Sequence, residues 1–129
     1  MPGPRILFVK LSSLGDVIHH LPAVTDAALH HPGAHIAWAV EEAYVDIARL
    51  HPAVARTIAV GLRGLRRDPL AGLRWKRLTA ARREVREGRW DYVIDTQGLV
   101  KSAWIARASD APRFGLDAAS ARESLAARF

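Results

Sequence analysis

The chain contains no cysteine, and this absence excludes several kinds of chemistry at once. Disulfides, zinc sites built on thiolates and cysteine nucleophiles are all ruled out. No apolar run approaches the roughly 20 residues that a helix needs to span a bilayer. Residues 1–5 lead straight into an apolar run without the pattern of a secretory signal, so we expect a cytoplasmic protein.

The composition is that of an ordinary globular domain with an uneven distribution of charge. Half of the 129 residues are hydrophobic and a quarter are charged, which is enough for one domain with its own core. The net charge is +6, and residues 63–89 contain ten basic and only three acidic side chains. This stretch is either the solvated face of a helix or a patch for phosphates and carboxylates, which arginine binds in a bidentate way.

Apolar runs alternate with segments of helical periodicity along the chain. Pro22 should kink or break the first helix, and Gly88 should end the third. The alternation predicts an α/β fold with a parallel sheet flanked by helices. Strands are predicted at 5–10, 35–40, 56–60, 92–95 and 113–115, and helices at 13–30, 41–50, 70–87 and 98–108, with a weak helix from 118.

Polar groups concentrate on the first predicted turn from a strand to a helix. In open parallel sheets, ligands bind at such turns because they lie at the carboxyl ends of the strands. The spacing Ser13-x-x-Asp16 is that of a capping box. Alternatively, Asp16 is a general base that takes a proton from an attacking hydroxyl, and the two roles are compatible. The other polar groups and free amides would then form a pocket that accepts anions, built by Lys10, Ser12, Ser13 and Gly15.

A second polar turn, residues 95–102, follows the strand predicted at 92–95 and should open at the same edge of the sheet. Gly98 permits a tight turn, and Gln97 offers two donors and an acceptor. Lys101 lies in the first turn of the next helix, where its charge opposes the helix dipole. It is either a solvated lysine or a sign of an anionic partner.

Other reactive residue types give no comparable signal. The six histidines include two adjacent pairs, and none has the spacing of metal ligands, so no metal site is expected. The chain has no Gly-x-Ser-x-Gly pattern that would support serine hydrolase chemistry. We expect the four tryptophans in or beside the core rather than as a platform for stacked bases.

Beyond these local patterns, the chain resembles the lipopolysaccharide heptosyltransferases. The resemblance runs in order along essentially the whole chain and rests on residues 6–19, 21–27, 38–42, 91–102 and 121–123. The blocks Ser-Ser-Leu-Gly-Asp and Gln-Gly-Leu-Val-Lys-Ser are its most specific parts. The resemblance implies a GT-B enzyme, in which two Rossmann-like domains face each other across a cleft. Residues 1–129 would be the N-terminal, acceptor-binding domain, and without the C-terminal donor domain the fragment is expected to be inactive alone.

The resemblance also implies a reaction and roles for individual residues. Heptose would pass from ADP-heptose to the Kdo of Kdo-lipid A with inversion, without a metal or cofactor, and Asp16 would be the general base. The family's motifs include Lys10 and Lys101, together with Gln97 and Gly98. The acceptor's phosphates and carboxylates would meet Arg63, Arg66, Arg67 and Arg122, although Gly64-Leu65 stands where a denser basic run is expected. Peripheral contact with the anionic inner face of the inner membrane would follow from the basic surface.

Two other functions remain open. One is a heptosyltransferase that acts on an already heptosylated acceptor, although Glu41-Glu42 and Gln97-Gly98-Leu99 favour the first transfer. The other is a non-enzymatic basic α/β module that binds a partner or nucleic acid through its arginine-rich helix. No nucleic-acid-binding motif is present, and the basic residues alternate with apolar ones at helical spacing, so nucleic acid is not the expected partner.

Overall fold

One parallel sheet organises the chain. The computed structural model describes residues 3–61 and 71–115, and within them five strands pair in the order β3-β2-β1-β4-β5. Every pairing between neighbouring strands is parallel, so the predicted α/β fold class is confirmed. The strands are β1 (Arg5–Val9), β2 (His35–Glu41), β3 (Val54–Val60), β4 (Tyr92–Asp95) and β5 (Arg113–Gly115).

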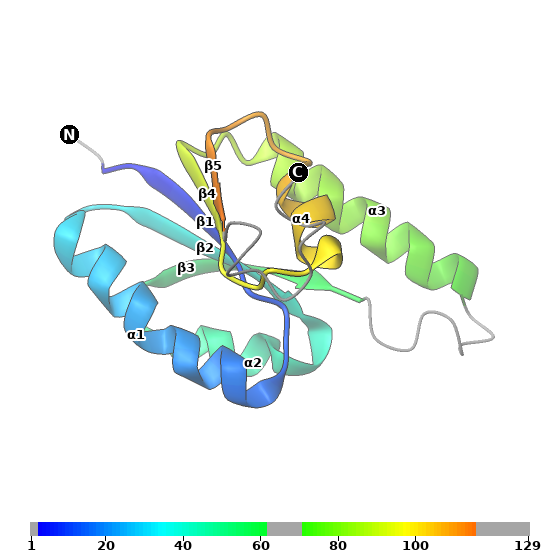
Figure 1. The fold of residues 1–129 in the computed structure, drawn as a ribbon, viewed down its shortest axis with the longest axis horizontal. Helices are drawn as coiled ribbons and strands as arrows, with labels where there is room; N and C mark the ends of the chain where they lie inside the picture. Colours follow the sequence, from blue (N-terminus) through cyan, green and yellow to red (C-terminus); the bar gives the residue numbers. More distant parts are fainter. Residues whose placement is uncertain (1–2, 62–70, 116–129) are drawn as a thin grey trace.

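Helices cover both faces of the sheet (Figure 1). One face carries α1 (Leu14–His30), the 3-10 helix η1 (Glu42–Tyr44) and α2 (Val45–Arg49). The other face carries α3 (Ala71–Glu87) and α4 (Val100–Ala106). Because both faces are buried, the central strands read as continuous apolar runs rather than as alternating patterns.

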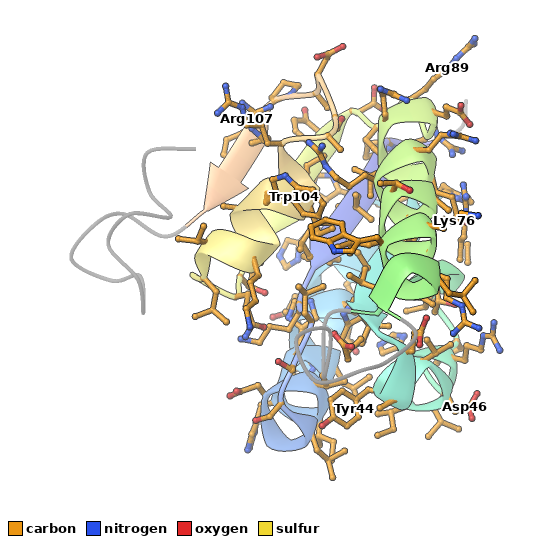
Figure 2. All side chains as sticks on the ribbon, turned by 90° about the vertical axis from the view of Figure 1, so that its right-hand side faces the viewer. Tyr44, Asp46, Lys76, Arg89, Trp104 and Arg107 are labelled. Carbon is orange, nitrogen blue, oxygen red and sulfur yellow. The ribbon has the colours of Figure 1, made fainter. Side chains whose placement is uncertain are left out.

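The four tryptophans lie in or beside the core, as predicted. Trp38 and Trp90 are buried, and Trp104 packs partly buried against the core beneath α3 and α4. Figure 2 shows Trp104 on α4, on the side that faces α3. Trp75 is half exposed, with its ring edge-on to that of Trp104 at 6.5 Å between centroids.

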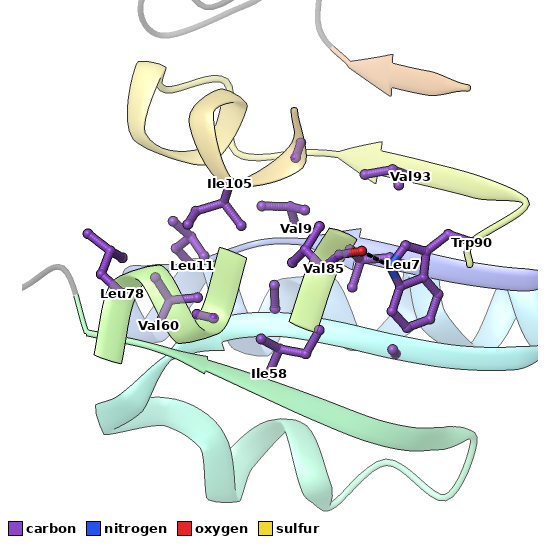
Figure 3. Packing of buried hydrophobic residues seen from close by; sticks show 14 residues of the cluster. Leu7, Val9, Leu11, Ile58, Val60, Leu78, Val85, Trp90, Val93 and Ile105 are labelled. Carbon is purple, nitrogen blue, oxygen red and sulfur yellow. Dashed lines mark hydrogen bonds between the residues drawn. The ribbon is translucent and has the colours of Figure 1, made fainter. Parts of the chain in front are cut away.

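The core beneath α3 and α4 explains the apolar spacing in the arginine-rich helix (Figure 3). Leu78, Ala81 and Val85 recur every three or four residues and are at most 3% exposed. They pack against the alternate side chains of β1, Leu7 and Val9, which are fully buried. Of the basic residues between them, Arg83 and Arg86 are exposed, whereas Arg82 is half-buried and lies over the ring of Trp104.

The end of α3 at Glu87 confirms the stop predicted at Gly88. Gly88 is needed there for close packing, however, and not for a left-handed backbone conformation. A Cβ at Gly88 would clash with the ring of Trp90, so close packing requires the glycine. The left-handed backbone conformation falls instead on Arg89, at a φ of 51°. The Trp90 indole N–H donates to the Val85 carbonyl at 2.8 Å and satisfies one of the free carbonyls at the helix end.

Of the kink or break predicted at Pro22, the break is wrong, because α1 runs without interruption from Leu14 to His30. Pro22 lies on the exposed side of the helix. A proline there leaves the carbonyl of Ile18 without its helical donor, and Ile18 is itself 47% exposed, so water can take that place.

Candidate functional site at the carboxyl ends of β1 and β4

Two polar turns meet at the carboxyl edge of the sheet, as the sequence predicted. The Oε1 atom of Gln97 accepts hydrogen bonds from the backbone N–H groups of Leu11, at 3.2 Å, and Ser12, at 3.4 Å. Gln97 is only 2% exposed. A side chain of the second turn therefore fixes the backbone of the first.

The second turn is organised by Asp95, the last residue of β4. One oxygen of its carboxylate accepts from the Gln97 N–H at 2.9 Å and the other from the Ser102 hydroxyl at 3.0 Å. Burial raises the pKa of Asp95, although these hydrogen bonds and the charge of Lys10 act against the rise. Gly98 takes a φ of 71°, which confirms the predicted tight turn. The helix α4 begins only at Val100, two residues later than predicted.

Lys10 joins the first turn to both of its neighbours. Its ammonium group donates to the Thr96 carbonyl at 3.2 Å, and its own carbonyl accepts from the Trp38 indole N–H at 2.9 Å. The adjacent Leu11 carbonyl accepts from the N–H of Glu41, at the end of β2. Three neighbouring strands thus deliver polar groups to one edge of the sheet.

Asp16 lies in the first turn of α1 and confirms the predicted capping box. Its Oδ2 atom accepts from the Ser13 N–H at 3.3 Å. Asp16 is half-buried, whereas Ser13 and Gly15 beside it are exposed. A Cβ at Gly15 would meet no atom within 4 Å, so the space above this helix start is open. The carboxylate is placed to meet a ligand from solvent, and its role as a base stays a prediction.

His20 lies beneath these turns and was not singled out as a site residue. Its ring makes edge contacts with Phe8 and Trp38, at 5.0 and 4.8 Å between centroids, and its Nδ1 lies 3.5 Å from the Thr96 hydroxyl. Burial, assisted by the charge of Lys10, lowers the pKa of His20 from 6.5 to about 4. The sequence signal that could have found it is its position three residues after the buried Val17, on the inner face of α1.

The lowered pKa of His20 predicts a loss of stability in mild acid. The unfolded chain takes up the proton near pH 6.5 and the folded chain only near pH 4, so stability falls as the pH drops through this window. At pH 5 the loss from this residue is about 2 kcal/mol relative to pH 7. Urea unfolding at both pH values measures it. His20→Phe keeps a ring against Phe8 and Trp38, and an equally large pH effect in that variant would contradict the assignment to His20.

The remaining predicted residues are only partly brought together. Ser12 is half-buried beside the Gln97 side chain, and Lys101 is exposed in the first turn of α4. Within residues 3–61 and 71–115, no group of three His, Asp or Glu side chains is placed to hold a metal ion. Asp95, Thr96 and Ser102 were not predicted as site residues, although an Asp two residues before a Gln-Gly pair is typical of an Asx-turn. Four predicted acceptor contacts lie outside the described residues: Arg63, Arg66, Arg67 and Arg122.

Comparisons with known proteins point to one family. The sequence model of glycosyltransferase family 9 (heptosyltransferase) matches residues 78–129. Lipopolysaccharide heptosyltransferase 1 of Pseudomonas aeruginosa is 50% identical over 97% of this chain, and the match covers 36% of that protein. The enzyme of the same name from Salmonella typhimurium is 45% identical over 97% of this chain and is covered to 40%.

A solved structure of a heptosyltransferase has a similar fold. The structure of E. coli heptosyltransferase WaaC with ADP-2-deoxy-2-fluoro heptose has a TM-score of 0.88 and 42% identity to this chain. The match covers 96% of this chain and 40% of that one. The chain thus spans about two fifths of the length of the proteins that it matches. No helix in the described part of the chain is long and apolar enough to cross a membrane.

Proposed function

We propose that this chain belongs to glycosyltransferase family 9, the heptosyltransferases, and is the acceptor-binding part of a lipopolysaccharide heptosyltransferase. The proposed reaction transfers heptose from ADP-heptose to the Kdo of Kdo-lipid A. The observation that carries the proposal is the 42–50% identity to such enzymes along nearly the whole chain, joined to a carboxylate turn at the edge of the sheet. The donor would be held mainly by a second, C-terminal domain that faces this edge.

The proposed chemistry is an inverting displacement at the anomeric carbon of heptose. A hydroxyl of the acceptor attacks that carbon, the bond to the ADP oxygen breaks, and ADP leaves with the bonding electrons. Asp16 takes the proton of the attacking hydroxyl. The start of α1 stabilises the carboxylate and makes it a weak base, which suffices when the hydroxyl loses its proton late in the reaction. The proposed mechanism uses no metal ion and no cofactor.

The basic side chains would bind the anionic groups of the acceptor. Arg63, Arg66, Arg67 and Arg122 would meet phosphates and carboxylates, and Lys10 and Lys101 would add positive charge at the edge where Asp16 lies. The net charge of +6 supports peripheral contact with the anionic inner face of the inner membrane, where a lipid-linked acceptor would be found. We therefore propose a cytoplasmic protein at that surface.

A titration with a soluble acceptor tests the proposal. The chain should bind the deacylated Kdo-lipid A backbone and should not bind ADP. Calorimetry or NMR measures both. Arg63→Ala and Arg66→Ala should each weaken acceptor binding by about tenfold, because each removes a charge-assisted contact worth about 1.5 kcal/mol. Lys76→Ala, a loss of charge on the exposed face of α3, is the matched control and should leave the affinity unchanged.

Three results would contradict the proposal. Binding to ADP alone would assign this chain to the donor side of the cleft. Binding to nucleic acid that ignores Arg63 and Arg66, but falls when charges on α3 are removed, would favour the non-enzymatic basic module. An acceptor that binds only after it has been heptosylated would favour the second heptosyltransferase activity instead.

A further inference from the structure

A concave surface lies between α3 and the C-terminal end of α4, away from the candidate site. It has a volume of about 300 Å³ and is lined by Thr79, Arg82, Arg83, Arg86, Arg107 and Ala108. Both helices run back towards the amino ends of the strands, so their C-terminal halves lie at the edge of the sheet opposite Asp16. In Figure 2, Arg107 lies at one end of the molecule, and Tyr44 and Asp46, which follow the carboxyl end of β2, lie at the other.

The charge of this α3–α4 groove is of one sign. Four of its six lining residues are arginines, and none is a carboxylate. The carboxylate of Glu84 on α3 pairs outside the groove, with Arg56 of β3 at 3.2 Å. Among residues 3–61 and 71–115, no ion pair involves Arg82, Arg83 or Arg86. Gathering like charges in this way costs free energy that a bound anion would recover.

One of these arginines is held in place by an aromatic ring. The guanidinium carbon of Arg82 lies 4.4 Å from the centre of the Trp104 ring, and Trp75 meets the same ring edge-on. A guanidinium that lies over an aromatic ring can still offer donors to an oxyanion. The Nε atom of Arg82 is buried and has no hydrogen-bond partner among the described residues. The donor is therefore desolvated already, and an anion that reached it would recover a hydrogen bond.

We propose that the α3–α4 groove is a binding site for phosphate groups, separate from the site at Asp16. Planar guanidinium groups bind phosphate oxygens in pairs, and a groove of this volume suits one phosphate or diphosphate group rather than a long polymer. The phosphate belongs either to a soluble anion or to the headgroup of an anionic phospholipid. The groove binds phosphate whether or not the chain also binds a Kdo-bearing acceptor.

NMR titration of the chain with inorganic pyrophosphate tests this site. Signals of Trp104 and of the N–H groups of the groove should shift in a saturable way. Arg82→Gln and Arg86→Gln should each weaken binding by about tenfold, since each removes a charged donor. Lys76→Gln, an equal loss of charge on the exposed face of α3, should change the affinity less than twofold. The absence of a saturable shift would overturn the proposal. So would a loss of affinity in Lys76→Gln as large as in Arg82→Gln, because pyrophosphate would then respond to the overall charge and not to a defined site.

Vesicles separate the two sources of phosphate. Phosphatidylcholine vesicles with and without phosphatidylglycerol should be compared for flotation of the chain and of Arg86→Gln. The lipid headgroup is a ligand of the groove if vesicle binding needs phosphatidylglycerol, falls in Arg86→Gln and is displaced by pyrophosphate. Saturable pyrophosphate binding without flotation identifies a soluble anion, and in that case the membrane contact proposed above fails while the groove stands.

Discussion

Asp16→Asn should reduce heptosyl transfer by about two to four orders of magnitude in a full-length enzyme that joins this chain to a donor domain. The amide cannot take the proton of the acceptor hydroxyl, but it has nearly the same shape as the carboxylate. The affinity for the acceptor should therefore change little. Steady-state transfer rates with ADP-heptose and Kdo-lipid A, together with a binding titration of the acceptor, separate the two quantities.

The capping role of Asp16 makes a matched control necessary. The carboxylate accepts from the Ser13 N–H at 3.3 Å, and its negative charge stabilises the start of α1. Asparagine keeps an acceptor but loses the charge, so the substitution also weakens the helix start, by about 1 kcal/mol at most. Ser13→Ala removes the serine hydroxyl from the same capping box and leaves the carboxylate in place. It should lower stability by a similar amount and transfer by much less than tenfold. Equal losses of transfer in Asp16→Asn and Ser13→Ala would mean that Asp16 acts only as part of the helix cap and not as a base.

The sequence was most informative where a pattern repeats along a strand or helix. Strands β4 and β5 have the predicted bounds, and β1 and β2 differ from theirs by a single residue. Strands β1 and β2 follow from apolar runs that are buried on both faces of the sheet, a local property of the sequence, whereas all three residues of β5 are exposed. The error at Pro22 has a tertiary cause, because the proline falls on the exposed side of α1, where the lost hydrogen bond can be replaced by water.

The candidate site could be located from the sequence, but its internal contacts could not. A turn at the end of each of two neighbouring strands was enough to bring Lys10 and Gln97 to one edge. The contacts themselves join residues about 86 positions apart, and these depend on the register of β1 against β4. The capping box at Ser13 and Asp16 was predicted because both partners lie in one helical turn.

Gln97→Leu should destabilise the chain by about 3 to 5 kcal/mol. The Gln97 oxygen is the acceptor for the N–H groups of Leu11 and Ser12, and the residue is 2% exposed. Leucine has a similar volume and no acceptor, so the buried N–H of Leu11 and the partly buried N–H of Ser12 would both lose their partner. Each buried unsatisfied donor costs about 1 to 3 kcal/mol. Urea denaturation of the two proteins at pH 7 measures the difference.

The variant Gln97→Glu separates hydrogen bonding from packing. Glutamate keeps an oxygen in the place of Oε1 and can accept from both N–H groups, with the Lys10 ammonium nearby to favour its charge. Its stability should lie between those of Gln97→Leu and the original chain, because the new carboxylate is buried beside Asp95. If Gln97→Leu proves as stable as the original chain, the first turn holds its shape without the hydrogen bonds to the Gln97 side chain. In that case the placement of Lys10 and Ser12 depends on β1 and α1 alone.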